Sequence, residues 1–101
     1  MNRIALKDGV RLYGLQQEML RAIDVCAEVF AQHDLQLTIT SARGGKHGSH
    51  SHHYKGLAID IRVWDIEGEI DLYVQRFSSA LGPDYQVFNE QDHIHVEYDP
   101  E

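Results

Sequence analysis

Cysteine is almost absent from this chain of 101 residues, with Cys26 as its one example. One cysteine excludes a disulfide within the chain and a metal site built from several thiolates. Cys26 shares its helical spacing with apolar neighbours, so we expect it to be a buried packing residue and not a nucleophile. Any metal bound here therefore needs other ligands.

Long apolar runs are missing as well. No stretch approaches the roughly 20 consecutive apolar residues of a membrane span, and residues 1–12 lack the apolar centre of a signal peptide. We therefore expect a protein made in the cytoplasm without a signal peptide. If it acts outside the cell, release or carriage in a particle has to bring it there.

Positive charge is scarce, with 9 Lys and Arg against 16 Asp and Glu, for a formal net charge of −7. This excess of acidic groups argues against nucleic acid or an anionic membrane as the main partner. A neutral or cationic polymer remains compatible with the charge.

The spacing of apolar residues predicts two helices, over residues 14–33 and 69–81. Shorter runs of alternating or β-branched apolar residues predict strands. These runs cover residues 35–42, 57–63, 85–88 and 93–98, after an irregular or strand-like lead-in over residues 3–12. The order of elements indicates one α+β domain over residues 1–101. We expect a small, mostly antiparallel sheet covered by two helices on one face.

The strand over residues 57–63 carries an aspartate, Asp60, among aliphatic residues. Because side chains on a strand alternate between faces, Asp60 is expected opposite the core, beside the small Ala58, which would leave room above the strand. The strand over residues 93–98 alternates in the same way and places His95 on its polar face. If the two strands are neighbours, Asp60 and His95 come within a few ångströms of each other.

A loop rich in glycine and histidine, residues 43–56, precedes the strand of Asp60. Gly56 permits a sharp turn that could bring His53 over the polar face. His53, Asp60 and His95 could then converge. Two imidazoles and one carboxylate suit Zn²⁺ and leave a fourth position for water, although the ligand types leave Mn²⁺ and Co²⁺ open.

Three further side chains are candidates for chemistry beside this group. Asp92 lies in a turn before the last strand and could accept a proton from a water molecule that zinc has acidified. His93 shares a face with His95 and could act in acid–base chemistry or orient a ligand through a hydrogen bond. Arg43 opens the glycine-rich loop and could bind a substrate carboxylate or a developing oxyanion, or pair with a surface acid.

Three motif pieces in order resemble a known family. The pattern S-x-H-x-x-G-x-A-x-D spans Ser51 to Asp60, D-H-I-H spans Asp92 to His95, and S-x-R spans Ser41 to Arg43. Together they resemble the zinc D-Ala-D-Ala carboxypeptidases, and equally the L-alanyl-D-glutamate endopeptidases of phage endolysins. Both groups share the Hedgehog/DD-peptidase fold, and the resemblance covers residues 14–98.

The resemblance implies zinc ligation by His53, Asp60 and His95, with Asp92 as general base and His93 as a further acid–base candidate. Many carboxypeptidases of the family carry Glu where this chain has Asp92.

The resemblance further implies that Arg43 stabilises substrate and oxyanion, and that Ser51 binds substrate or orders the loop. The implied reaction is hydrolysis of peptide bonds next to D-amino acids in peptidoglycan stem peptides. Endopeptidase and carboxypeptidase activity are not distinguished.

The chain departs from the family in being short, without a separate wall-binding module, and in its extra loop histidines. His47, His50 and His52 could compete as ligands or be solvated loop residues. A histidine-loop metal carrier and a catalytically silent, zinc-stapled structural or virion-associated module are the alternative functions. With stem peptides as partner, we expect a monomer or a component of a phage particle that acts on the cell wall.

Overall fold

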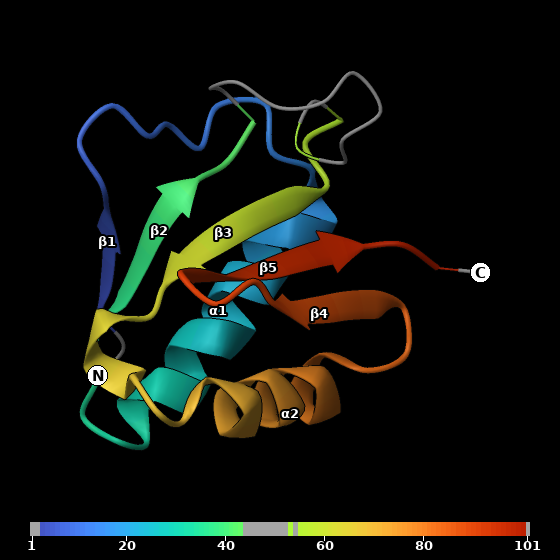
Figure 1. Ribbon diagram of the computed structural model, residues 1–101. Helices are drawn as coiled ribbons and strands as arrows, with labels where there is room; N and C mark the ends of the chain where they lie inside the picture. Colours follow the sequence, from blue (N-terminus) through green and yellow to red (C-terminus); the bar gives the residue numbers. More distant parts are fainter. Residues whose placement is uncertain (1–2, 44–52, 54, 101) are drawn as a thin grey trace.

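A computed structural model describes residues 3–43, 53 and 55–100 of the chain (Figure 1). Its elements, in chain order, are β1 (Ile4–Leu6), α1 (Gln17–Ala31), β2 (Leu37–Ser41), β3 (Ala58–Arg62), a short 3₁₀ helix η1 (Trp64–Ile66), α2 (Ile70–Leu81), β4 (Tyr85–Asn89) and β5 (His93–Tyr98). Every predicted helix and strand is present. The lead-in forms the edge strand β1, and η1 is an element that the apolar pattern did not predict.

The five strands form one sheet in the order β1-β2-β3-β5-β4. β1 pairs with β2 in parallel, and the other neighbours are antiparallel. In Figure 1, α1 runs behind the sheet and α2 passes on the side of β4. The predicted α+β class with a mostly antiparallel sheet is confirmed.

Helix α1 packs on the sheet through the predicted apolar stripe. Its buried residues are Met19, Ala22, Ile23, Cys26, Ala27, Val29 and Phe30. Phe30 contacts Tyr73 and Phe77 of α2 with ring centroids 5.3 Å away in both pairs, which joins the two helices in one core. Cys26 is fully buried, and burial raises the pKa of its thiol, so its predicted role as packing residue is confirmed.

The helix predicted from residue 14 begins only at Gln17. Gly14 has φ +83°, and Gln16 is extended with ψ 157°, neither of which continues an α-helix. The backbone N–H of Gln16 donates instead to the carbonyl of Gly56, 2.9 Å away. A tertiary contact therefore replaces the first predicted turn, although Leu15 still packs against the core.

The β3–β5 pair has one apolar and one polar face. Asp60 pairs with His95, and Arg62 with His93, in the register of the two strands. The residues between them on the core face, Ile59, Ile61, Ile94 and Val96, are fully buried. The predicted neighbouring strands and their alternation are therefore confirmed.

One detail of the polar face differs from the prediction. Ala58 is fully buried, so the space above it is filled and not open. The small side chain reflects close packing at that position.

Neither described helix combines the length and the apolar character needed to cross a bilayer.

Candidate metal centre

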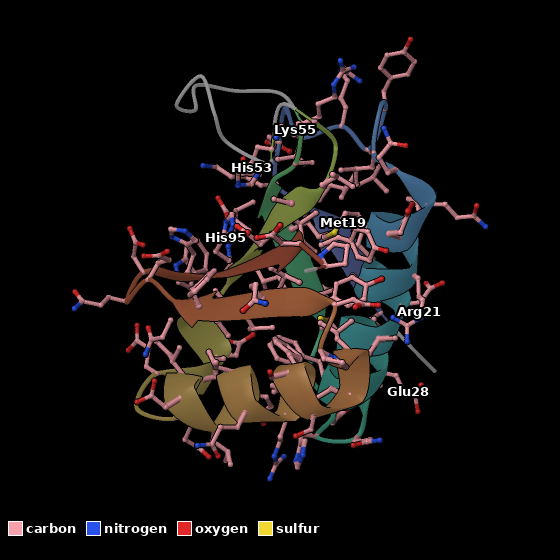
Figure 2. The ribbon with its side chains drawn as sticks, turned by 90° about the vertical axis from the view of Figure 1, so that its right-hand side faces the viewer. Met19, Arg21, Glu28, His53, Lys55 and His95 are labelled. Carbon is pink, nitrogen blue, oxygen red and sulfur yellow. The ribbon has the colours of Figure 1, made fainter. Side chains whose placement is uncertain are left out.

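The three predicted ligands come from two central strands and the segment just before one of them. Asp60 lies in the middle of β3, His95 is its cross-strand neighbour on β5, and His53 precedes β3 by a few residues. Figure 2 shows His53 and His95 on the side of the sheet away from α1. The ligand atoms of all three side chains lie within 4.8 Å of one another, and the group could hold a metal ion.

One oxygen of Asp60 is the centre of this group. Its Oδ1 lies 3.2 Å from Nε2 of His53 and 2.9 Å from Nδ1 of His95. The imidazole ring centroids of the two histidines are 5.1 Å apart. His53 is buried, whereas Asp60 and His95 are half-buried, so the group is close to the surface.

The protonation of His53 is fixed by its second ring nitrogen. Nδ1 lies 2.8 Å from the backbone carbonyl oxygen of Ala42, which can only accept a hydrogen bond. Nδ1 must therefore carry the proton and donate it. In a neutral imidazole this leaves the lone pair on Nε2, the nitrogen that faces Asp60.

In His95 the roles of the two ring nitrogens are reversed. Its Nε2 lies 2.8 Å from Oε1 of Glu97, two residues along the same strand face. A carboxylate accepts the proton of Nε2, so a neutral His95 turns the lone pair of Nδ1 toward Asp60. A carboxylate or carbonyl behind a ligating imidazole is the usual support that fixes its tautomer in metal sites.

With both rings neutral, two imidazole lone pairs and a carboxylate would thus point at one place. Three acceptors at such distances repel one another unless positive charge lies between them. Either a metal ion or protons on the rings can supply that charge. The donor set of two nitrogens and one oxygen fits a divalent transition metal, and these residues could hold one.

The pKa values of the group show the same demand for positive charge. Burial alone would raise the pKa of Asp60, but hydrogen bonds from His53 and His95, and the charges of the histidines, hold it well below its usual range. Burial alone would lower the pKa of His95, but Asp60 and Glu97 raise it above its ordinary value. The carboxylate is therefore ionised, and His95 binds a proton more tightly than a free imidazole.

Two glycines position His53. The N–H of Gly56 donates to the carbonyl of His53 at 3.0 Å, and the carbonyl of Gly56 accepts from Gln16 at the start of α1. Gly56 has φ +73°, and a Cβ on it would lie 2.2 Å from the carbonyl oxygen of Gly14. Only glycine permits this close approach of the two backbones. The segment before α1 therefore holds the turn that carries His53.

His93 and Asp92 form a second, adjacent pair. Nδ1 of His93 lies 2.6 Å from Oδ1 of Asp92, and its Nε2 lies 3.6 Å from Oδ1 of Asp60. Asp92 itself is strongly exposed, with 88% of its side-chain surface accessible. The structure thus places Asp92 at the outer end of a line of side chains that leads through His93 to Asp60.

Arg43 lies one residue after the carbonyl that supports His53. Its side chain is exposed and passes over Gly14, where a Cβ would lie 2.6 Å from its Cδ. Ser51 and the histidines His47, His50 and His52 lie outside the described residues, so their predicted roles stay predictions.

Sequence reasoning missed three parts of the site. Glu97 was available from the strand pattern, because it shares the polar face with His95 two residues away. The carbonyl of Ala42 and the contact of Gly14 with Gly56 had no local signal. They depend on how distant segments meet.

Comparisons with protein-family models, with curated proteins and with solved structures return no match to this chain. A functional proposal therefore has to rest on the motif and on the geometry of the site.

Proposed function

We propose that this protein is a zinc metallopeptidase that hydrolyses peptide bonds next to D-amino acids in bacterial peptidoglycan stem peptides. The observation that carries the proposal is the convergence of Nε2 of His53 and Nδ1 of His95 on Oδ1 of Asp60, at 3.2 Å and 2.9 Å. Each imidazole is held from behind by an acceptor, Ala42 in one case and Glu97 in the other.

Zinc, when bound, would polarise the scissile carbonyl and lower the pKa of a water molecule. The chain would supply the remaining steps. Asp92 takes the proton of the attacking water and returns it to the leaving amine. His93, hydrogen-bonded to Asp92 at 2.6 Å, is the second candidate for this proton transfer. Arg43 stabilises a substrate carboxylate or the oxyanion, and Ser51 binds substrate or orders the loop.

The choice of zinc and of peptidoglycan rests on the motif. The spacing of Ser41 to Arg43, Ser51 to Asp60 and Asp92 to His95 resembles that of the zinc D-Ala-D-Ala carboxypeptidases and L-alanyl-D-glutamate endopeptidases. The three residues to which the resemblance assigns zinc ligation, His53, Asp60 and His95, have ligand atoms within 4.8 Å of one another. A shared Hedgehog/DD-peptidase fold, release or carriage in a phage particle, and action on the cell wall belong to the same proposal.

Digestion of purified peptidoglycan tests the proposal. Zinc-loaded protein is incubated with walls of several peptide chemotypes, and mass spectrometry identifies the new termini. We expect new ends beside a D-amino acid, which would also separate endopeptidase from carboxypeptidase action. Absence of cleavage in every chemotype, with one zinc bound per chain, would reject the enzyme and favour a structural zinc module.

The two proton-transfer candidates are separated by single substitutions. Asp92→Asn should lower kcat by at least about 100-fold, because general acid–base catalysis contributes about 10² to 10⁴, while zinc and fold are retained. If Asp92 acts directly, His93→Gln should retain most of the rate. If Asp92 acts through His93, both substitutions lower kcat alike. A structural module predicts that neither substitution changes any property beyond local stability.

A further inference from the structure

A cleft adjoins the metal centre, and the proposed function gives this cleft no role. It has a volume of about 730 Å³ and lies between residues 7–13 and the end of β2. Among the described residues, its lining includes Lys7, Asp8, Arg11, Ser41, Ala42 and Arg43. Its size is that of an ordinary ligand site.

The cleft shares one wall with the metal centre. Ala42, which lines the cleft, accepts the hydrogen bond that orients His53, and Ser41 is the register partner of Asp60. Neighbouring strands are about 4.8 Å apart, so a chain bound at the metal centre reaches the cleft within one or two residues. Figure 1 shows the segment before α1 crossing the end of the sheet at which β2 ends and β3 begins.

The charge of the cleft is opposite to that of the whole chain. Lys7, Arg11 and Arg43 line it, against the single carboxylate of Asp8, whereas the chain as a whole has 16 acidic and 9 basic side chains. In the described part of the chain, neither Lys7 nor Arg11 has an ion-pair partner. A local cluster of cations favours the binding of an anionic ligand, even on a protein whose net charge is negative.

The basic residues stand on a fixed backbone. The N–H of Lys7 donates to the carbonyl of Ile39 in β2 at 3.0 Å, and the N–H of Val10 donates to Lys7 at 2.9 Å, which closes the turn around Gly9. Val10 also packs against the core. The side chains of Lys7 and Arg11 therefore start from defined backbone positions on the wall of the cleft.

We propose that this cleft binds a free carboxylate on the stem peptide, within a few residues of the cleaved bond, and selects acidic over amidated peptides. The inference rests on the proposed function for the identity of the peptide. Lys7 and Arg11 are specificity-determining residues that touch the flank of the substrate and not its reacting atoms. Arg43 lines the cleft and directly follows Ala42, whose carbonyl accepts the hydrogen bond from His53.

The test compares two synthetic stem peptides that differ only in whether the D-glutamate carboxylate is free or amidated. For zinc-loaded wild type, we expect kcat/KM for the acid to exceed that for the amide by about fivefold or more, through KM. In Lys7→Gln/Arg11→Gln, the preference should fall below about twofold, through a higher KM for the acid. Arg21→Gln/Arg76→Gln removes the same charge from the helices and should keep the preference.

A wild type without preference, or a cleft variant that keeps it, would overturn the cleft proposal while the peptidase proposal stands. If no peptide is cleaved, calorimetric titration of both peptides into zinc-loaded protein decides. If wild type binds the acidic peptide more tightly than the amide and the cleft variant does not, the cleft proposal is supported and the peptidase proposal is rejected. Equal binding of acid and amide, or none, rejects the cleft as well.

Discussion

The two faces of the β3–β5 pair are built from alternate residues of the same strands but carry opposite chemistry. On one face, Ile61 and Ile94 are fully buried against the helices. On the other, Asp60 and His95 are register partners in a half-buried polar cluster. The core residues and the polar cluster are thus neighbours along the strands, but their side chains lie on opposite faces of the sheet.

This arrangement indicates that the two properties can be changed separately. Apolar burial stabilises the fold by roughly 25 cal/mol per Å² and needs no particular partner. The polar face, in contrast, contains converging acceptors that are favourable only with added positive charge. Substitutions on the two faces should therefore leave different signatures.

The largest effect is expected for Asp60→Ala, which removes the carboxylate at the centre of the cluster. The variant should fold but retain no zinc after dialysis, because two imidazoles alone bind weakly. Elemental analysis measures the metal content. Asp65→Ala, an exposed acid in η1, is the control and should bind zinc as wild type does. One firmly bound zinc in Asp60→Ala would rule out the proposed centre.

Ile61→Ala should have the complementary signature on the core face. Removing a fully buried isoleucine leaves a cavity and costs about 2–5 kcal/mol of unfolding free energy. Urea unfolding measures the loss. The folded variant should still bind one zinc ion, and loss of zinc by folded protein would show that the faces are coupled.

Gly56→Ala should disturb both properties, because the glycine joins the fold to His53. Its Cβ would lie 2.2 Å from the carbonyl oxygen of Gly14, at φ +73°. Gly68→Ala is a matched control with φ +85° and nothing within 4 Å of the added atom. Both pay the backbone strain of about 1–3 kcal/mol, but Gly56→Ala should be further destabilised and bind zinc more weakly. Equal losses would show that the contact with Gly14 has no role.

Glu97→Gln keeps the shape of the side chain behind His95 but removes its charge. Such supporting groups typically change metal affinity by about 10–100-fold, and we expect a loss in this range. A competition titration with a chromophoric chelator gives the affinity. The exposed Glu67→Gln should bind as wild type does, and an unchanged affinity in Glu97→Gln would mean that Glu97 does not orient His95.

The smallest effect is expected from pH on the metal-free protein. Because the folded pKa of His95 is raised above 6.5, its contribution to stability is complete below that pH and is lost as pH rises through the folded pKa. Asp60, with a lowered pKa, contributes above pH 3.8 and loses this as pH falls further.

If zinc binds as proposed, it would replace the proton of His95, and the rise in melting temperature on adding zinc should be greater at pH 8 than at pH 6. A melting shift independent of pH would contradict this linkage.

The faces also differ in how far sequence predicts them. The alternation around Asp60 and His95 predicts both the core residues and the polar side chains, because a strand has a fixed period of two. Convergence of His53 depends on the Gly14–Gly56 contact between segments about forty residues apart, which no local pattern encodes. The start of α1 was misplaced for the same reason.

Asp92 shows a second limit. Its turn permits several side-chain directions. From the sequence alone, we expected its carboxylate to face the metal position. The structure places its carboxylate on His93 at 2.6 Å. Local chemistry predicts which groups are present at a turn, whereas their directions depend on neighbouring side chains.

The backbone junction of Gly14 and Gln16 with Gly56 has a practical consequence for anyone who redesigns this domain. The residues ahead of α1 cannot be trimmed, swapped with those of another scaffold or relocated by circular permutation as though they were a disposable leader. They supply one of the two backbone segments whose contact fixes the position of His53. A graft would have to carry the segments of Gly14 and Gly56 together.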